Sequence, residues 1–144
     1  MASTATPPVP IKRLEQIATD ACNSALSGVE FYDHSKTGQW NQTIIEKILK
    51  AVTSEATPQG ATPAYKFAIN STIVQHVVPN SQLNRAVPAA SGSEDGKKTQ
   101  AGRRGMHSAT AGYWNEKTDG MWSFKFDGGD RGLDVVIMLI WIAI

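Results

Sequence analysis

The final stretch of the chain constrains the fold more than any other feature. It consists of Leu133-Asp134-Val135-Val136-Ile137-Met138-Leu139-Ile140-Trp141-Ile142-Ala143-Ile144. Its Ile and Val content favours a strand, and the ten apolar residues after Asp134 are too few for a membrane-spanning helix, which needs about 20. Successive side chains of a strand point to opposite faces, and here both faces are apolar. Both faces of this strand must therefore be covered.

Two amphipathic helices are predicted near the start of the chain. Apolar residues repeat with helical spacing from Ile11 onward, and Gly28 is suited to end this first helix. The same spacing predicts a second helix over about 37–53, and a loop with Pro and Gly follows at 57–63. Each helix carries one apolar stripe, which is typical of a helix that packs on a single surface.

Beyond this loop the period of the apolar residues changes from helical spacing to alternation. Alternation predicts strands at Tyr65–Val78, Met106–Trp114, Met121–Asp127 and 133–144. Helices followed by strands predict an α+β fold, in which two N-terminal helices pack on a four-stranded antiparallel sheet.

Two segments are too polar to join a core. Residues 1–10 are small, polar and rich in Pro, and we expect a disordered tail. Residues 79–104 are rich in Ser, Asn, Gly, Ala and Pro, and a loop of this length within a compact domain indicates a disordered insertion. The rest of 11–144 is expected to form a single domain, as the length of the chain suggests.

One copy of the chain has too few elements to cover its last strand. Two helices cover one face, and the simplest cover for the other is a second copy, because two-fold homodimers are the commonest assemblies. Four such side chains left in water would cost about 6–12 kcal/mol, which is comparable to the stability of a whole domain. The alternative, the insertion 79–104 folding over this face, is disfavoured by its polarity.

The pattern leaves open which face meets the second copy. The predicted dimer interface therefore includes both faces of the last strand and one nearby tryptophan. These residues are Val135, Val136, Ile137, Met138, Leu139, Ile140, Trp141 and Trp114.

No catalytic or metal-binding constellation stands out, so we expect neither an enzyme nor a cofactor. His34, His76 and His107 lie far apart, and with Cys22 as the one cysteine neither a zinc site nor an internal disulfide is expected. Asp33-His34-Ser35 contains the residue types of a catalytic triad, but adjacent residues rarely converge, and local helix capping is favoured.

Charge excludes some partners. The formal net charge is +1, which gives no excess of basic residues for nucleic acid or an anionic membrane. The first ten residues lack the charged and apolar regions of a signal peptide, and a single thiol is typical of a reducing compartment. We expect no membrane insertion.

A series of short motifs runs along 11–78 and 105–144. They are His34-Ser35-Lys36 with Gln39-Trp40, Tyr65-Lys66-Phe67, His107-Ser108-Ala109, Tyr113-Trp114, Thr118-Asp119-Gly120 and Ile142-Ala143-Ile144. In this order they resemble the Tctex family of dynein light chains. The resemblance implies a strand-swapped homodimer whose two sheets face each other, with the strand at about 105–114 crossing to the partner's sheet.

The resemblance also implies a function and partners. Members of the family are non-catalytic light chains of the cytoplasmic dynein motor, found with microtubules in the cytoplasm. They bind a disordered N-terminal segment of dynein intermediate chain, on which other dynein light chains also sit, and thereby support motor assembly and the attachment of cargo proteins. A dimeric adaptor that joins other disordered partners outside dynein is the alternative.

The implied mechanism is strand addition, in which a peptide pairs with the exposed backbone of an edge strand. Small side chains allow this close approach, and the alternative is a plain edge strand whose small residues serve packing. The predicted peptide-binding residues are Met106, His107, Ser108, Ala109, Thr110, Ala111, Gly112 and Tyr113.

Two features depart from the family pattern. The insertion 79–104 falls at the crossover into the swapped strand, where the family usually has a short turn. A longer connection costs little closure entropy, so the swap stays possible. The insertion also allows an unswapped arrangement, or could partly cover the peptide-binding groove that the family has beside the swapped strand. Trp141 stands where family members often carry a small residue.

Overall fold

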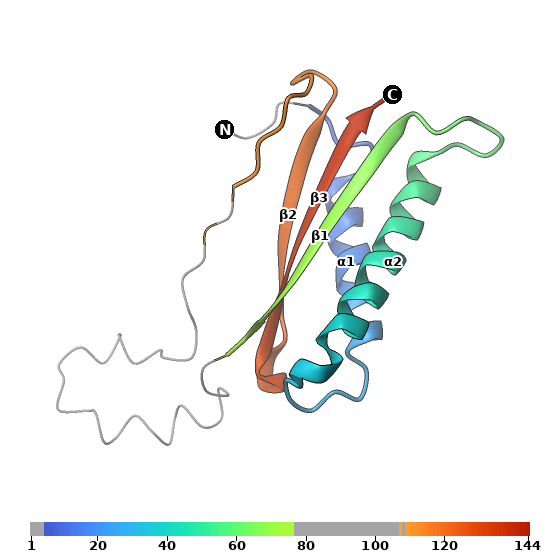
Figure 1. The fold of residues 1–144 in the computed structure, drawn as a ribbon. Coiled ribbons are helices and arrows are strands. Elements are labelled where there is room, and N and C mark those ends of the chain that lie inside the picture. Colours follow the sequence, from blue (N-terminus) through green and yellow to red (C-terminus); the bar gives the residue numbers. More distant parts are fainter. Residues whose placement is uncertain (1–4, 77–106, 108) are drawn as a thin grey trace.

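The computed structural model describes residues 5–76, 107 and 109–144 (Figure 1). Its elements, in chain order, are α1 (Ile11–Ala25), the short helix η1 (His34–Lys36), α2 (Thr37–Ala56), β1 (Tyr65–Gln75), β2 (Gly120–Asp127), the short helix η3 (Gly129–Arg131) and β3 (Leu133–Ala143). The α+β class is confirmed, with both helices N-terminal to an antiparallel sheet.

The helices form one layer and the sheet forms the other (Figure 1). The strand order is β1-β3-β2, so the last strand of the chain lies in the centre. Both helices lie on the same side of the sheet, where α2 packs over β1 and α1 packs against β2. In the part of the chain that the structure describes, the opposite side of the sheet carries no helix.

Local chemistry accounts for both ends of α1 and for the start of α2. α1 begins at Ile11, directly after Pro10, whose carbonyl accepts the Leu14 N–H at 2.9 Å. Gly28 follows with φ +77°, a conformation that glycine adopts without steric cost. The capping role expected before the second helix is also confirmed, because Asp33 Oδ1 accepts the Ser35 N–H at 3.0 Å. A hydrogen bond from the Ser35 hydroxyl, together with this backbone bond, holds the pKa of the Asp33 carboxyl below its usual range.

The sheet is regular over its whole length. β1 pairs with β3 at eleven successive positions, from Tyr65 opposite Ala143 to Gln75 opposite Leu133. β2 pairs with the other edge of β3, beginning with Gly120 opposite Trp141. Gly120, which has no side chain, stands opposite the largest side chain of the strand, Trp141, which is 1% exposed and belongs to the hydrophobic core.

Three strands are described, and a fourth was predicted at 106–114. His107 and residues 109–114 form no strand in the single chain, so this fourth strand stays a prediction. The insertion expected at 79–104 lies outside the described residues.

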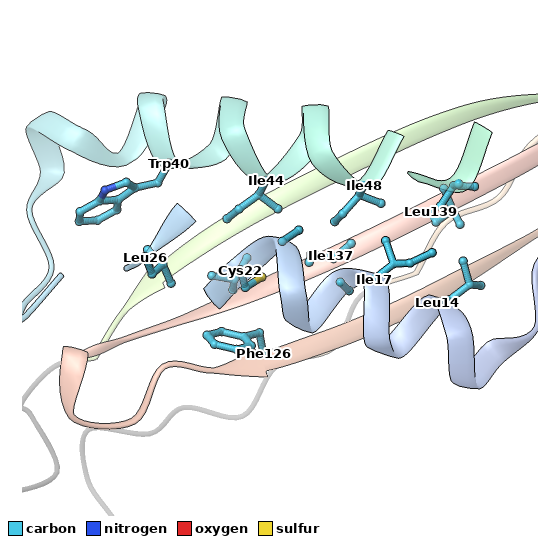
Figure 2. Packing of buried hydrophobic residues seen from close by; sticks show 14 of the residues in the cluster. Leu14, Ile17, Cys22, Leu26, Trp40, Ile44, Ile48, Phe126, Ile137 and Leu139 are labelled. Carbon is cyan, nitrogen blue, oxygen red and sulfur yellow. The ribbon is translucent and has the colours of Figure 1, made fainter. Parts of the chain in front are cut away.

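The hydrophobic core lies between the two layers (Figure 2). Stripes from both helices, including Leu14, Ile17, Ile44 and Ile48, point toward one face of β3. The core also contains Val9, which lies within the tail that we expected to be disordered and is 1% exposed. The apolar contacts of this layer fix the orientation of the central strand, and with it the side chains that the other face displays.

Candidate dimer face and peptide-binding segment

The central strand β3 has two faces that differ in cover. The first consists of four core side chains that are at most 1% exposed and lie beneath the helices: Val135, Ile137, Leu139 and Trp141. The second, which we call the outer face, consists of Val136, Met138, Ile140 and Ile142. The first three are half-buried, and Ile142 is 40% exposed. Of the residues predicted for the dimer interface on β3, the helices leave only the outer-face set for a partner.

The neighbours of the outer face are more polar than its centre. Register places the β1 residues Thr72, Asn70, Ala68 and Lys66 beside Val136, Met138, Ile140 and Ile142. On the other side, the β2 residues Lys125, Ser123 and Met121 stand opposite Val136, Met138 and Ile140. The outer face is therefore an apolar strip along the centre of the sheet with a mixed polar border. This is the layout of a recognition surface with an apolar centre and a polar rim.

A cluster of His76, Asp134 and Lys125 lies at one end of this strip. His76 Nε2 lies 3.1 Å from Asp134 Oδ2, and Lys125 Nζ lies 3.5 Å from the same oxygen. Asp134 Oδ1 accepts the Gly128 N–H at 3.3 Å. Asp134 is 8% exposed, and a buried carboxylate requires such partners because it has lost its hydration. Asp134 was visible as the one polar residue in the apolar stretch, but its pairing with His76 depends on the register of β1.

The described residues 109–113 of the segment predicted to bind a peptide lie beside β2 and form no strand (Figure 1). Met106 and Ser108 fall outside the described residues. Of the others, His107, Ala109, Ala111, Gly112 and Tyr113 are exposed. Thr110 is half-buried, and its hydroxyl donates to Met138 Sδ at 2.6 Å. This contact places the segment next to the outer face, with most of its small side chains in solvent.

A carboxylate anchors the C-terminal end of this segment. Asp119 Oδ1 accepts the Ala143 N–H at 2.8 Å and the Thr118 hydroxyl at 2.9 Å, while Oδ2 accepts the Asn115 N–H at 2.9 Å. The backbone bonds from Ala143 and Asn115 are the main cause that lowers the pKa of Asp119 from its ordinary value of 3.8. The turn before β2 is thereby tied to the end of β3, so that residues 109–114 connect to a fixed point at Asn115.

Two comparisons with known proteins point to one family. The sequence profile of the Tctex-1 family matches residues 8–142. The chain belongs to the Tctex-1 family. A protein named dynein light chain Tctex-type, from Schizosaccharomyces pombe, is 33% identical over 137 residues, which cover 95% of this chain and 97% of that protein. The Tctex-1 similarity therefore includes the helices, all three strands and the segment beside β2.

The residue types that could act as nucleophiles or bases in this Tctex-1 domain are hydrogen-bonded locally or buried. The Ser35 hydroxyl donates to Asp33 Oδ1 at 2.6 Å, whereas His34 Nδ1 contacts the Tyr32 hydroxyl at 2.7 Å, so the three triad-type residues do not form a relay. The Cys22 thiol is buried, and burial raises its pKa to about 12. Such a thiol is a poor nucleophile at neutral pH.

Within the described ranges of the Tctex-1 domain, no three His, Cys, Asp or Glu side chains come together as a metal site would require. In the same ranges no helix has the length and apolar character to cross a membrane.

Proposed function

We propose that this protein is a light chain of the cytoplasmic dynein motor. It acts as a non-catalytic homodimer that binds an extended segment of dynein intermediate chain, and so supports motor assembly and cargo attachment in microtubule-based transport. The observation that carries the proposal is the apolar outer face of β3, which no described helix covers, beside the small residues of 109–113, which form no strand. Membership in the Tctex-1 family and the name of the yeast relative support it.

The exposed apolar surface of the outer face supports the proposed second copy. Val136, Met138 and Ile140 are half-buried and Ile142 is 40% exposed, so a facing sheet would remove further apolar surface from water. At about half of the 1.5–3 kcal/mol for each buried side chain, the gain is about 3–6 kcal/mol per protomer. A gain of this size matters for a domain whose total stability is about 5–15 kcal/mol.

The segment at 105–114 completes the sheet of the second copy in this proposal. β2 lies at an edge of the sheet, where an incoming strand finds unpaired backbone groups. Ala109, Ala111 and Gly112 keep the segment narrow, so a further backbone can approach it. The intermediate-chain segment adds next to this strand and places alternate side chains in pockets.

Affinity in such a complex depends on pairing two sites. An intermediate-chain segment that is disordered when free loses chain entropy on binding, so a single site is weak. A dimer presents the site twice, and a neighbouring light chain on the same segment adds another contact. Linked sites raise the effective concentration for the second binding event, which is a physical reason for a dimeric light chain.

Calorimetry with an N-terminal peptide of dynein intermediate chain tests the proposal. We expect binding to the wild type, and we expect Ala111→Glu to weaken it at least about tenfold, because a charge would sit against the incoming backbone. Ala61→Glu is the matched control, since Ala61 is also an exposed alanine outside helices and strands. This variant should bind the intermediate-chain peptide with the affinity of the wild type.

Absence of heat and of chemical-shift changes with the wild-type protein would refute intermediate-chain binding. Affinity purification then separates the remaining explanations. Recovery of dynein heavy chain with the protein supports a motor subunit, whereas a dimer recovered with other disordered partners and no dynein heavy chain would indicate an adaptor outside the motor.

A further inference from the structure

We propose that the free edge of β1, together with the adjoining flank of α2, is a second strand-addition site that takes an extended, mostly uncharged peptide. In the order β1-β3-β2, this edge is the opposite edge of the sheet from β2 and residues 109–119. The site is therefore separate from the groove of the proposed function, and its occupant does not compete for the same backbone.

The backbone of β1 is open along one side. β1 pairs with β3 over its eleven residues, and no other described segment forms backbone hydrogen bonds with its second edge. Natural edge strands are usually protected by prolines, bulges, short length or charges. β1 has no proline and an unbroken register, and Lys66 is its one charged residue. β2, at the other edge, is shorter at eight residues and carries both Lys125 and Asp127.

One side of α2 adds apolar side chains beside this edge. The Ser71 hydroxyl of β1 donates to Asn41 Oδ1 of α2 at 2.8 Å, which fixes the rotation of the helix over the strand. Ile45 lies one turn and Leu49 two turns beyond Asn41, so helical spacing places both near this flank. Ile45 is half-buried and Leu49 is 39% exposed. We call Ile45 and Leu49 the α2 ledge.

The strand side chains beneath the helix layer are incompletely covered as well. Phe67, Ile69 and Ile73 of β1 face the helices and pack against the core, yet each is only half-buried. Their counterparts on the central strand, such as Ile137 and Leu139, are at most 1% exposed because strands flank them on both sides. One additional strand beside β1 would give these side chains the cover that the central strand already has.

Geometry selects a single peptide over a second copy of the chain. Adjacent strands lie about 4.8 Å apart, whereas packed helices need about 8–10 Å. Because α2 packs over β1 itself, a copy joined through its own β1 would bring a second α2 too close to the first. An extended peptide adds a strand without a helix, and it fits beside the α2 ledge.

The two faces of the site define the chemistry of the occupant. Side chains of the peptide that point toward the helices meet Phe67, Ile69 and the α2 ledge, and should be apolar. Those on the other face meet Ala68, Asn70 and Thr72, which favour small polar groups. Near Lys66 an acidic residue gains a favourable charge interaction. The expected ligand alternates β-branched apolar and small polar residues, with an acid at one end.

The experiment uses the full chain with its intermediate-chain groove already saturated by the N-terminal peptide. The probe is a synthetic peptide that alternates Val and Thr and ends in Glu, titrated while backbone amide shifts are recorded. We expect shifts along β1 and at Leu49. A probe with N-methyl groups on alternate residues should not bind when its methylated edge faces β1, because the ladder hydrogen bonds are lost.

Two matched variants test the ledge. Leu49→Lys should weaken the probe about tenfold through loss of an apolar contact. Ile11→Lys should leave affinity unchanged, because Ile11 is equally exposed at 41% but lies at the start of α1. Circular dichroism of both variants shows that the fold is intact. The second site would be overturned by amide shifts confined to β2 and 107–119, by equal weakening in both variants, or by no binding at millimolar probe. None of these results bears on the intermediate-chain groove.

Discussion

The two faces of β3 carry similar side chains and have different surroundings. Ile137 lies beneath the helices and is fully buried, whereas Ile140, three residues further along the same strand, lies on the outer face and is half-buried in the single chain. Hydrophobicity alone does not separate them. The difference teaches that one face makes the protomer fold, while the other gives the folded protomer a surface for association.

The ends of the two faces differ in a second respect. The helix-facing side is apolar from Leu133 to Trp141, and its one indole is fitted opposite Gly120. The outer face ends in the cluster of His76, Asp134 and Lys125. His76 and Asp134 are themselves buried, and Lys125, whose side chain is exposed, is the member of the cluster that keeps contact with water.

The largest expected effect comes from placing a charge on the helix-facing side. Ile137→Asp buries a carboxylate with no cation near it, at a cost of several kcal/mol that approaches the whole stability of the domain. We expect loss of helical circular dichroism. Ile137→Val, which removes one methylene, should cost only about 0.5–1.5 kcal/mol and stay folded. A folded Ile137→Asp protein would show that this face is not the core.

A smaller effect is expected from the same change on the outer face. In Ile140→Asp the helices still cover their own face, and the new carboxylate reaches water in the single chain. We expect light scattering to fall from about twice the 15.5 kDa chain mass to about that mass, with helical signal retained. Ser123→Asp, at the polar border, should leave assembly less affected. An Ile140→Asp protein of unchanged mass would remove the outer face from the dimer.

The smallest expected effect concerns Asp119, which ties the turn before β2 to the end of β3. Because backbone N–H groups lower its pKa in the folded state, the stability it contributes is fully present above its ordinary value of 3.8 and is lost as the pH falls through the lower folded value. Asp119→Asn should reduce stability at neutral pH by less than the core substitution does. Urea midpoints measured from neutral pH to below 3.8 should fall less steeply in the variant, and equal slopes would contradict this role.

Local elements were predictable from sequence because their signals are local. The apolar spacing from Ile11 and the capping role of Asp33 each depend on residues within one or two turns, and both are confirmed. The second helix runs three residues past its predicted end, to Ala56, because Pro58 rather than the end of the stripe stops it. By contrast, no sequence period pairs His76 with Asp134.

The candidate site was predictable in part. Sequence indicated that the last strand needs cover on both sides and that 106–113 is narrow enough for a second backbone. The strand state of that segment depends on what it pairs with, so a single chain does not test it. The ledge of Ile45 and Leu49 was missed, because these residues looked like the margin of an apolar stripe until β1 was placed beneath α2.

The sequence by itself determined that this is an α+β protein with an apolar last strand and a Tctex-1 pattern. Only the tertiary structure decided that β3 is central and which of its faces the helices cover. The physical reason is symmetry: a strand apolar on both sides can present either face, and a shift of one residue exchanges them. Packing against the two helices removes this ambiguity, because their stripes fit one face and leave the other free.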